Sequence, residues 1–229
     1  MALIDKLSAI GDAIRAKTGK ADKLTLDQMP TEIASIETGG TLSDTNKLAQ
    51  RADGTLTEIT AEDLVGVTDI VDYAFYGCAE CTHITIPKSV IQIRSYAFAR
   101  CNKLSSITFE DGINLQILGT FVFQYNYTLE HIDLPNTITD IGQRAFTYSV
   151  LKEITIPNSV HEMGNEVFAY CQKLEKVEMK STTPPTIGTN MFKNCTALEQ
   201  IIVPIGSGDA YKSATNWSAY ADIIVEGEV

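Results

Sequence analysis

The sequence is short of positive charge and of long apolar runs. Its 229 residues contain 18 Lys and Arg against 29 Asp and Glu, and the formal net charge is −11. So few cations leave no basic face for nucleic-acid phosphates and little attraction to an anionic membrane surface. No run reaches 18 apolar residues, so we expect no helix that inserts into a bilayer.

The N-terminus also lacks the apolar core of a secretory signal peptide, because Asp5 and Lys6 stand where it would be. We therefore expect a cytoplasmic location before assembly, with a virion or an extracellular surface as the final location. The five cysteines are an odd number spread over a long chain, which does not fit a disulfide framework.

What the sequence does contain is an internal repeat. A phenylalanine recurs six times at intervals of 22 to 25 residues, and an apolar residue stands five places before each one. After each phenylalanine comes an apolar–any–apolar triplet. The six anchor phenylalanines are Phe75, Phe98, Phe123, Phe146, Phe168 and Phe192.

Units this short cannot bury their own apolar side chains, so they must stack and share one core. The triplets have the two-residue period of a strand with one face inward. We predict at least five parallel strands, centred on residues 85, 108, 133, 155 and 178, with all six anchor phenylalanines buried.

The consensus is Ile-Gly-x-x-Ala-Phe-x-x-Cys-x-x-Leu-x-x-Ile-x-Ile-Pro-x-Ser-Val, as in IGQRAFTYSVLKEITIPNSV at residues 141–160. It resembles the BspA-like, or treponemal-type, leucine-rich repeats over residues 67–205. The resemblance implies an α+β repeat fold: a right-handed leucine-rich-repeat solenoid of about six coils, with a parallel β-sheet on one face.

Three flanking segments break the repeat. Residues 1–38 carry apolar side chains at helical spacing and predict a small helical head for attachment or oligomerisation. This head resembles the N-terminal segment of phage and prophage structural proteins. Residues 41–66 predict a capping hairpin that turns at Ala52-Asp53-Gly54. Residues 206–229 predict a C-terminal cap with a short helix and a last strand.

Cys78 and Cys81 have the spacing of a redox or zinc half-site, but the repeat offers a second interpretation. Four cysteines lie three residues after an anchor phenylalanine, where the other two coils have Asn126 and Ser149. This register predicts a buried hydrogen-bonding ladder of reduced, unmetallated thiols. The four are Cys78, Cys101, Cys171 and Cys195.

Two outward rows are candidates for binding. The first is the outer face of the predicted strands, and the alternative is a solvated surface rich in β-favouring threonine. It consists of His83, Thr85, Ser106, Thr108, His131, Asp133, Glu153, Thr155, Lys176 and Glu178. The second is an aromatic edge of Tyr125, Tyr148 and Tyr170, which would form a platform for a sugar ring or simply pack together.

No nucleotide-binding loop and no nucleophile–base spacing occurs, and His83 and His131 lie two coils apart. We therefore expect no enzyme, no catalytic residue, no cofactor and no metal site. The expected function is a non-catalytic recognition or scaffold module that binds a protein or a glycan, encoded by a phage or prophage. A bacterial cell-surface adhesin, which the resemblance also implies, is the alternative.

Overall fold

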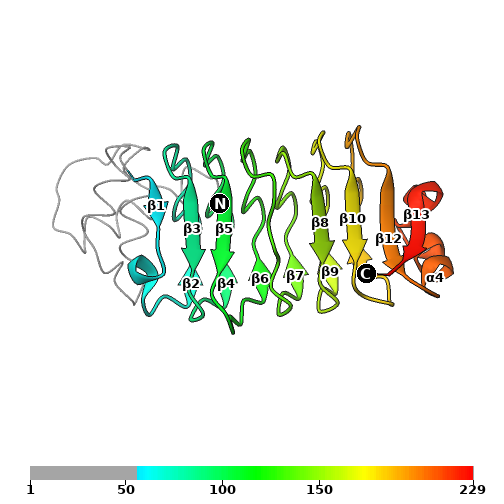
Figure 1. Ribbon diagram of the computed structural model, residues 1–229, viewed down its shortest axis with the longest axis horizontal. Coiled ribbons are helices and arrows are strands. Elements are labelled where there is room, and N and C mark those ends of the chain that lie inside the picture. The colour runs from blue at the N-terminus through cyan, green and yellow to red at the C-terminus, as the bar shows by residue number, and fades with distance from the viewer. Residues whose placement is uncertain (1–55, 229) are drawn as a thin grey trace, which may run out of the picture.

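The computed structural model describes residues 56–228, which stack into an elongated solenoid with parallel strands side by side along its length (Figure 1). The predicted helical head, residues 1–38, lies outside the described residues, as does the predicted turn at Ala52-Asp53-Gly54. The described chain therefore begins within the predicted N-terminal cap.

The predicted strands form the first face of the solenoid. β3 (His83–Ile86) pairs in parallel with β1 (Glu58–Ile59) and β5 (Ser106–Phe109). Further along, β10 (Lys176–Met179) pairs in parallel with β8 (Glu153–Ile156) and β12 (Gln200–Pro204). Inward and outward side chains alternate, as in the buried Ile84 and Ile86 of β3. The parallel solenoid predicted from the repeat is confirmed.

The strand predicted around residue 133 is wrong. Residues 131–134 keep the alternation, with Ile132 and Leu134 buried, but they are not a strand, and this face is divided into a three-stranded and a four-stranded sheet. The change in coil length falls at this segment, since 25 residues separate Ser106 from His131 and only 22 separate His131 from Glu153.

A second parallel sheet runs without a break, and the repeat pattern did not indicate it as strands. Its six two-residue strands contain the apolar residue five places before each anchor. They are β2 (Asp69–Ile70), β4 (Gln92–Ile93), β6 (Ile117–Leu118), β7 (Asp140–Ile141), β9 (Glu162–Met163) and β11 (Thr186–Ile187).

Each coil turns at two left-handed residues, one two places before the anchor and one two places after it. Only Gly77 among these twelve is a glycine. Left-handed backbone costs other residues about 1–2 kcal/mol each. Backbone hydrogen bonds between coils hold this left-handed conformation. The N–H groups of Tyr96 and Arg100, for example, donate to the carbonyl oxygens of Thr120 and Gln124 in the next coil. Side chains at each left-handed position are consequently aligned along the solenoid.

The six anchor phenylalanines are buried, as predicted, and stack plane to plane through the core. Neighbouring ring centroids lie 5.3 to 5.7 Å apart. The column ends on Tyr220, whose ring meets Phe192 edge-on at 5.1 Å. One continuous aromatic column therefore crosses the break in the first sheet.

The predicted hydrogen-bonding ladder lies beside this column. The thiols of Cys101, Cys171 and Cys195 donate to the anchor carbonyl of the preceding coil at 3.2, 3.1 and 2.9 Å. Asn126 Nδ2 does the same toward Phe98 O at 3.1 Å. Cys195 is half-buried rather than buried, because its coil is next to the end of the repeat.

The C-terminal segment closes the solenoid. It contains α4 (Gly208–Ser213), the 3-10 helix η2 (Ser218–Ile223) and β13 (Ile224–Gly227), which pairs in parallel with β12. Trp217 is fully buried and its Nε1 donates to Pro185 O at 2.8 Å. At the other end, η1 (Glu62–Leu64) follows β1, and the strand in this predicted hairpin region pairs in parallel with β3.

Candidate functional site

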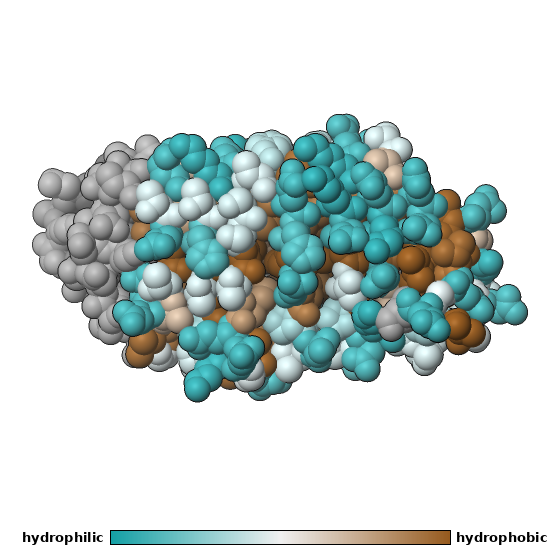
Figure 2. Space-filling model, viewed as in Figure 1, coloured by the Kyte–Doolittle hydropathy of each residue, from teal (hydrophilic) through white to brown (hydrophobic). Residues whose placement is uncertain are grey.

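The outer face of the first sheet changes in polarity along the solenoid. Figure 2 shows near-neutral colours over β3 and β5, hydrophilic side chains over β8 and β10, and apolar ones at the β12–β13 end. At that end Ile202 and Val225 are register partners, and Val225 is 42% exposed. All ten residues predicted for this face are exposed or half-buried.

In the N-terminal part of this face the polar groups bond one another. His83 Nδ1 lies 2.7 Å from Ser106 Oγ, and its Nε2 lies 3.1 Å from Thr85 Oγ1. Thr108 is the register partner of Thr85. These short side chains form a fixed hydroxyl-rich surface with no net charge. Beyond them, His131 Nε2 pairs with Asp133 Oδ1 at 2.9 Å.

In the C-terminal part the charged groups form a network. Lys176 Nζ lies 3.1 Å from Glu153 Oε2 and 3.6 Å from Glu178 Oε1. Glu178 Oε2 in turn accepts from Thr155 Oγ1 at 3.3 Å and lies 3.5 Å from Lys180 Nζ. The Glu153 carboxylate raises the pKa of Lys176, so that cation is fixed at neutral pH.

A hollow of about 520 Å³ lies where β8, β10 and β12 begin. It is lined by Glu130, His131, Lys152, Glu153, Glu175, Lys176, Glu199 and Gln200. Four carboxylates thus face two ammonium groups. Lys152 pairs with Glu130 at 2.7 Å, which lowers the pKa of that carboxyl through a hydrogen bond.

Sequence reasoning named His131, Glu153 and Lys176 of this lining but missed the charged residues Glu130, Lys152, Glu175 and Glu199. Each precedes the first strand-face residue of its coil in the printed sequence. A charged residue at the same repeat position in four successive coils was the signal that could have found them. Only stacking turns that repetition into one surface.

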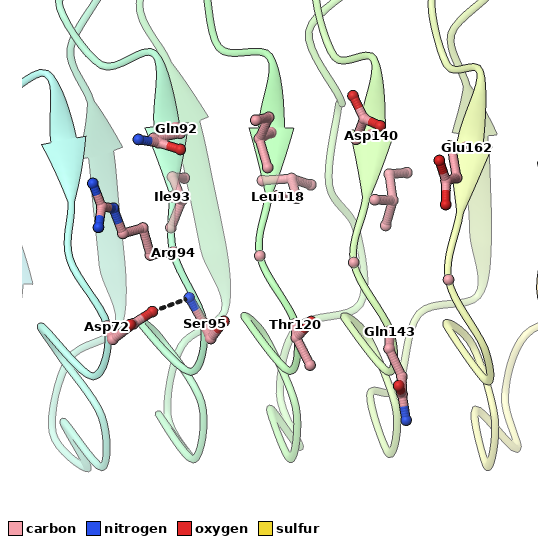
Figure 3. A pocket seen from close by; sticks show the side chains of 15 residues that line it. Asp72, Gln92, Ile93, Arg94, Ser95, Leu118, Thr120, Asp140, Gln143 and Glu162 are labelled. Atoms are coloured by element: carbon pink, nitrogen blue, oxygen red, sulfur yellow. Dashed lines mark hydrogen bonds between the residues drawn. The ribbon is translucent and has the colours of Figure 1, made fainter. Parts of the chain in front are cut away.

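A groove of similar volume, about 520 Å³, crosses the second sheet (Figure 3). Gly119, Gly142 and Gly164 form its middle, and an added Cβ at each would overlap backbone of the preceding coil. Asp72, at one end, accepts a hydrogen bond from the Ser95 N–H at 2.7 Å. The glycines are explained by this close backbone approach, so the groove follows from coil stacking.

The three tyrosines of the predicted aromatic edge stack face to face. Tyr125, Tyr148 and Tyr170 lie at left-handed positions with ring centroids 4.8 and 4.6 Å apart and planes within 18°. Arg100 lies over the outer face of Tyr125 and Lys193 lies 5.9 Å from the ring centroid of Tyr170. With their faces covered, the rings expose edges and hydroxyls.

A second column of left-handed residues, which the sequence did not indicate, lies two places before the anchors. Tyr73, Tyr96 and Phe121 stack at 4.7 and 4.5 Å. Arg144 then lies 5.7 Å from the Phe121 centroid, and its Nε pairs with Glu166 at 2.6 Å.

Residues 56–228 contain neither a metal-binding cluster nor a membrane-spanning helix. No group of three or more His, Cys, Asp or Glu side chains is placed to hold a metal ion there. In the same residues, no helix has the length and apolar character needed to cross a membrane.

Comparison with known proteins agrees with this geometry. A family model described as the BspA type leucine rich repeat region matches six copies over residues 68–199. The chain belongs to the BspA-type leucine-rich-repeat family. No curated protein matches the chain.

Two solved structures of bacterial proteins share the fold. A leucine-rich-repeat protein of T. pallidum is 28% identical, with a TM-score of 0.50 over 64% of this chain and 62% of its own. The pneumococcal vaccine antigen PcpA is 27% identical, with a TM-score of 0.51 over 62% of this chain and 37% of its own. This BspA-type chain therefore spans less than two thirds of either protein.

A third match is a leucine-rich cell surface protein of Faecalibacterium prausnitzii, which is 23% identical. Its TM-score is 0.42, and the match covers 64% of this chain and 60% of the other.

Proposed function

We propose that this BspA-type protein is a non-catalytic recognition module that binds a protein ligand on its first-sheet face. The charged hollow at the start of β8, β10 and β12 carries the proposal. Its lining has four glutamates and two lysines, so its charge favours a partner that presents Lys or Arg side chains. The neighbouring Ile202 and Val225 add apolar contact beside that charge.

The ion pairs at the hollow support recognition rather than chemistry. Lys152 and Lys176 are each held by a glutamate of the preceding coil. Such exposed pairs contribute little to folding stability, but they fix the charge pattern that a partner meets. A partner's cations would then interact with Glu175 and Glu199.

Binding to an array of tiled 15-residue peptides tests this proposal, with the full chain as the labelled probe. The wild type should select peptides rich in Lys and Arg, and the double variant E175K/E199K should lose them. Because the double variant adds charge, D111K/D222K, outside the hollow, is the matched control and should keep the same peptides. Selection of no basic peptide, or equal selection by all three proteins, would contradict the proposal.

For attachment we propose the head, residues 1–38, joined to a phage or prophage particle. The apolar positions Leu7, Ile10 and Ile14 at helical spacing support this role. Light scattering of the purified full chain and of L7D/I14D tests whether the head self-associates: a fall in oligomeric mass in the variant is expected, and equal masses would count against it.

A bacterial surface adhesin is the second candidate, favoured by the similarity to the pneumococcal vaccine antigen. Immunogold labelling separates the two. Label on purified particles supports attachment to a particle, and label on intact cells supports the adhesin.

A further inference from the structure

The tyrosine edge of Tyr125, Tyr148 and Tyr170 combines stacked rings, nearby cations and unused hydroxyls. Tyr211 and Tyr220, in the cap, use their hydroxyls in hydrogen bonds with Ser181 O and the Phe192 N–H. Within residues 56–228, no such bond is found for the hydroxyls of Tyr125, Tyr148 and Tyr170. Three phenol groups are thus available to a ligand at intervals of 4.6 to 4.8 Å.

The stacking also sets the electrostatic character of this edge. An aromatic ring is negative on its face and positive at its edge. Here the faces are covered by other tyrosines and, at the two ends of the stack, by Arg100 and Lys193. What remains exposed is a row of positive ring edges with O–H donors, which attracts anions.

The charged side chains around the tyrosine edge are also mostly positive. A hollow of about 200 Å³ is lined by the three tyrosines with Gln124, Arg144, Thr147, Glu166 and Lys193. With Arg100, which covers Tyr125, three cations face the single carboxylate of Glu166, and Arg144 holds that carboxylate at 2.6 Å. A chain with a net charge of −11 therefore has a locally positive site.

Burial and the neighbouring phenols of Tyr170 and Tyr125 raise the pKa of Tyr148. Its hydroxyl consequently stays protonated, and able to donate, throughout the neutral range. Phenol hydroxyls also accept hydrogen bonds, so the row can satisfy both the hydroxyls and the oxyanion of one ligand.

We infer that this edge binds a sugar that carries a carboxylate, such as a uronic acid within an acidic glycan. The carboxylate would lie between the cations and the tyrosine hydroxyls, and the sugar hydroxyls would bond along the row. The hollow is small, and the rest of the chain repels polyanions, which favours one charged sugar unit over an extended nucleic acid. This inference is independent of protein binding on the first-sheet face.

Calorimetric titration of the full chain with a hyaluronan hexasaccharide, whose uronates alternate with neutral sugars, tests this inference. Neutral chitohexaose is the comparison ligand. The uronate ligand should bind, more weakly at high ionic strength, and chitohexaose should not. Binding of neither sugar, equal binding of both, or competition by inorganic phosphate at the same concentration as by free glucuronate would overturn the inference.

Two variants locate the site on this edge. Y125F/Y148F/Y170F keeps the ring stack and removes the hydroxyls, while R100Q/K193Q removes two cations. Each should weaken binding about tenfold or more, the scale of losing charge-assisted hydrogen bonds. K88Q/K212Q removes the same charge from exposed positions outside both hollows and should bind like the wild type. Unchanged affinity in both edge variants would overturn the assignment.

Discussion

At the scale of single residues, the anchor phenylalanines contribute both burial and stacking. Phe123 is fully buried between Phe98 and Phe146, at centroid distances of 5.7 and 5.5 Å. Phe121, two residues earlier, lies half-buried in an outer column instead. Two phenylalanines of the same coil therefore lie in different environments.

Replacing Phe123 with Ala should lower the free energy of unfolding by about 3–5 kcal/mol, because it removes buried surface and leaves a cavity. Phe121→Ala is the matched control and should cost roughly 1–2 kcal/mol, since its ring is partly solvated already. Urea unfolding followed by circular dichroism measures both. Equal losses would show that the inner column has no special role in stability.

The glycines of the repeat separate into two classes by environment. A Cβ at Gly142 would lie 2.6 Å from Gly119 C and Thr120 N, in the backbone of the preceding coil. That backbone is held by the hydrogen bond from Gly142 N to Leu118 O, at 2.7 Å. Gly112 has φ of +75° but nothing within 4 Å of its added Cβ.

Gly142→Ala should therefore separate two coils and destabilise the protein by about 2–3 kcal/mol, as overpacking does. Gly112→Ala should cost only about 1 kcal/mol, the penalty of a left-handed alanine. Thermal unfolding of both variants makes the comparison. A larger loss for Gly112→Ala would contradict this account of why the consensus requires glycine.

At the scale of elements, residues 131–134 differ from their neighbours in backbone pairing rather than in burial. Ile132 and Leu134 point inward like other strand residues. Yet these four residues take no part in the parallel pairing that holds β10 between β8 and β12. The break is thus a local loss of hydrogen bonds within an intact core.

Amide hydrogen exchange by NMR should detect this break. Amides of residues 132–134 should exchange roughly tenfold or more faster than those of β10, because unbonded amides need no opening step. β4 and β7 of the continuous second sheet are an internal control and should stay protected on either side of the break. Equal protection of residues 132–134 and β10 would mean that the pairing is restored in solution.

The C-terminal cap depends on one carboxylate. Glu226 Oε1, on β13, accepts from the Gly208 N–H at 2.7 Å, where α4 begins. Hydrogen bonds from the Gly206 and Gly208 amides lower the pKa of Glu226 below its usual 4.5. A lowered folded-state pKa adds stability above the unfolded value, and this stability is lost as pH falls through the folded value.

Glu226→Gln should accordingly lower the melting temperature at pH 7, and the gap to wild type should close as pH falls below about 4.5. Differential scanning fluorimetry between pH 7 and pH 3 follows this change. Glu228→Gln, two residues on in the exposed end, is the control and should leave the curve unchanged. A difference in melting temperature that widens as the pH falls would contradict this prediction.

At the scale of the whole molecule, two features of the fold continue across the break in the first sheet. The second sheet pairs continuously from β2 to β11, and the phenylalanine column runs from Phe75 to Phe192. Nearest-neighbour coupling of this kind transmits stability along a solenoid. The molecule should consequently unfold as one unit although its first sheet is divided.

The cysteines can test this cooperative unfolding, because they lie in both halves of the solenoid. Cys78, Cys81 and Cys101 are in the N-terminal half, and Cys171 and Cys195 are in the C-terminal half. Hydrogen bonding and burial raise the pKa of Cys81 and of Cys195. Cys78, Cys101 and Cys171 are buried, so a labelling reagent reaches few thiols in the folded protein. Labelling resolved by mass spectrometry should be slight without denaturant and should rise in both halves at one urea concentration. Earlier labelling of one half would show that the break uncouples them.

The sequence by itself determined the repeat, the inward side chains and the thiol ladder. These follow from spacing alone, since every coil buries the same positions against its neighbours. The break at residues 131–134, the second sheet and the face-to-face tyrosines were decided only by the tertiary structure. Each depends on how one coil's length and left-handed residues match the next coil. Such matching is a relation between coils, and no single repeat contains it.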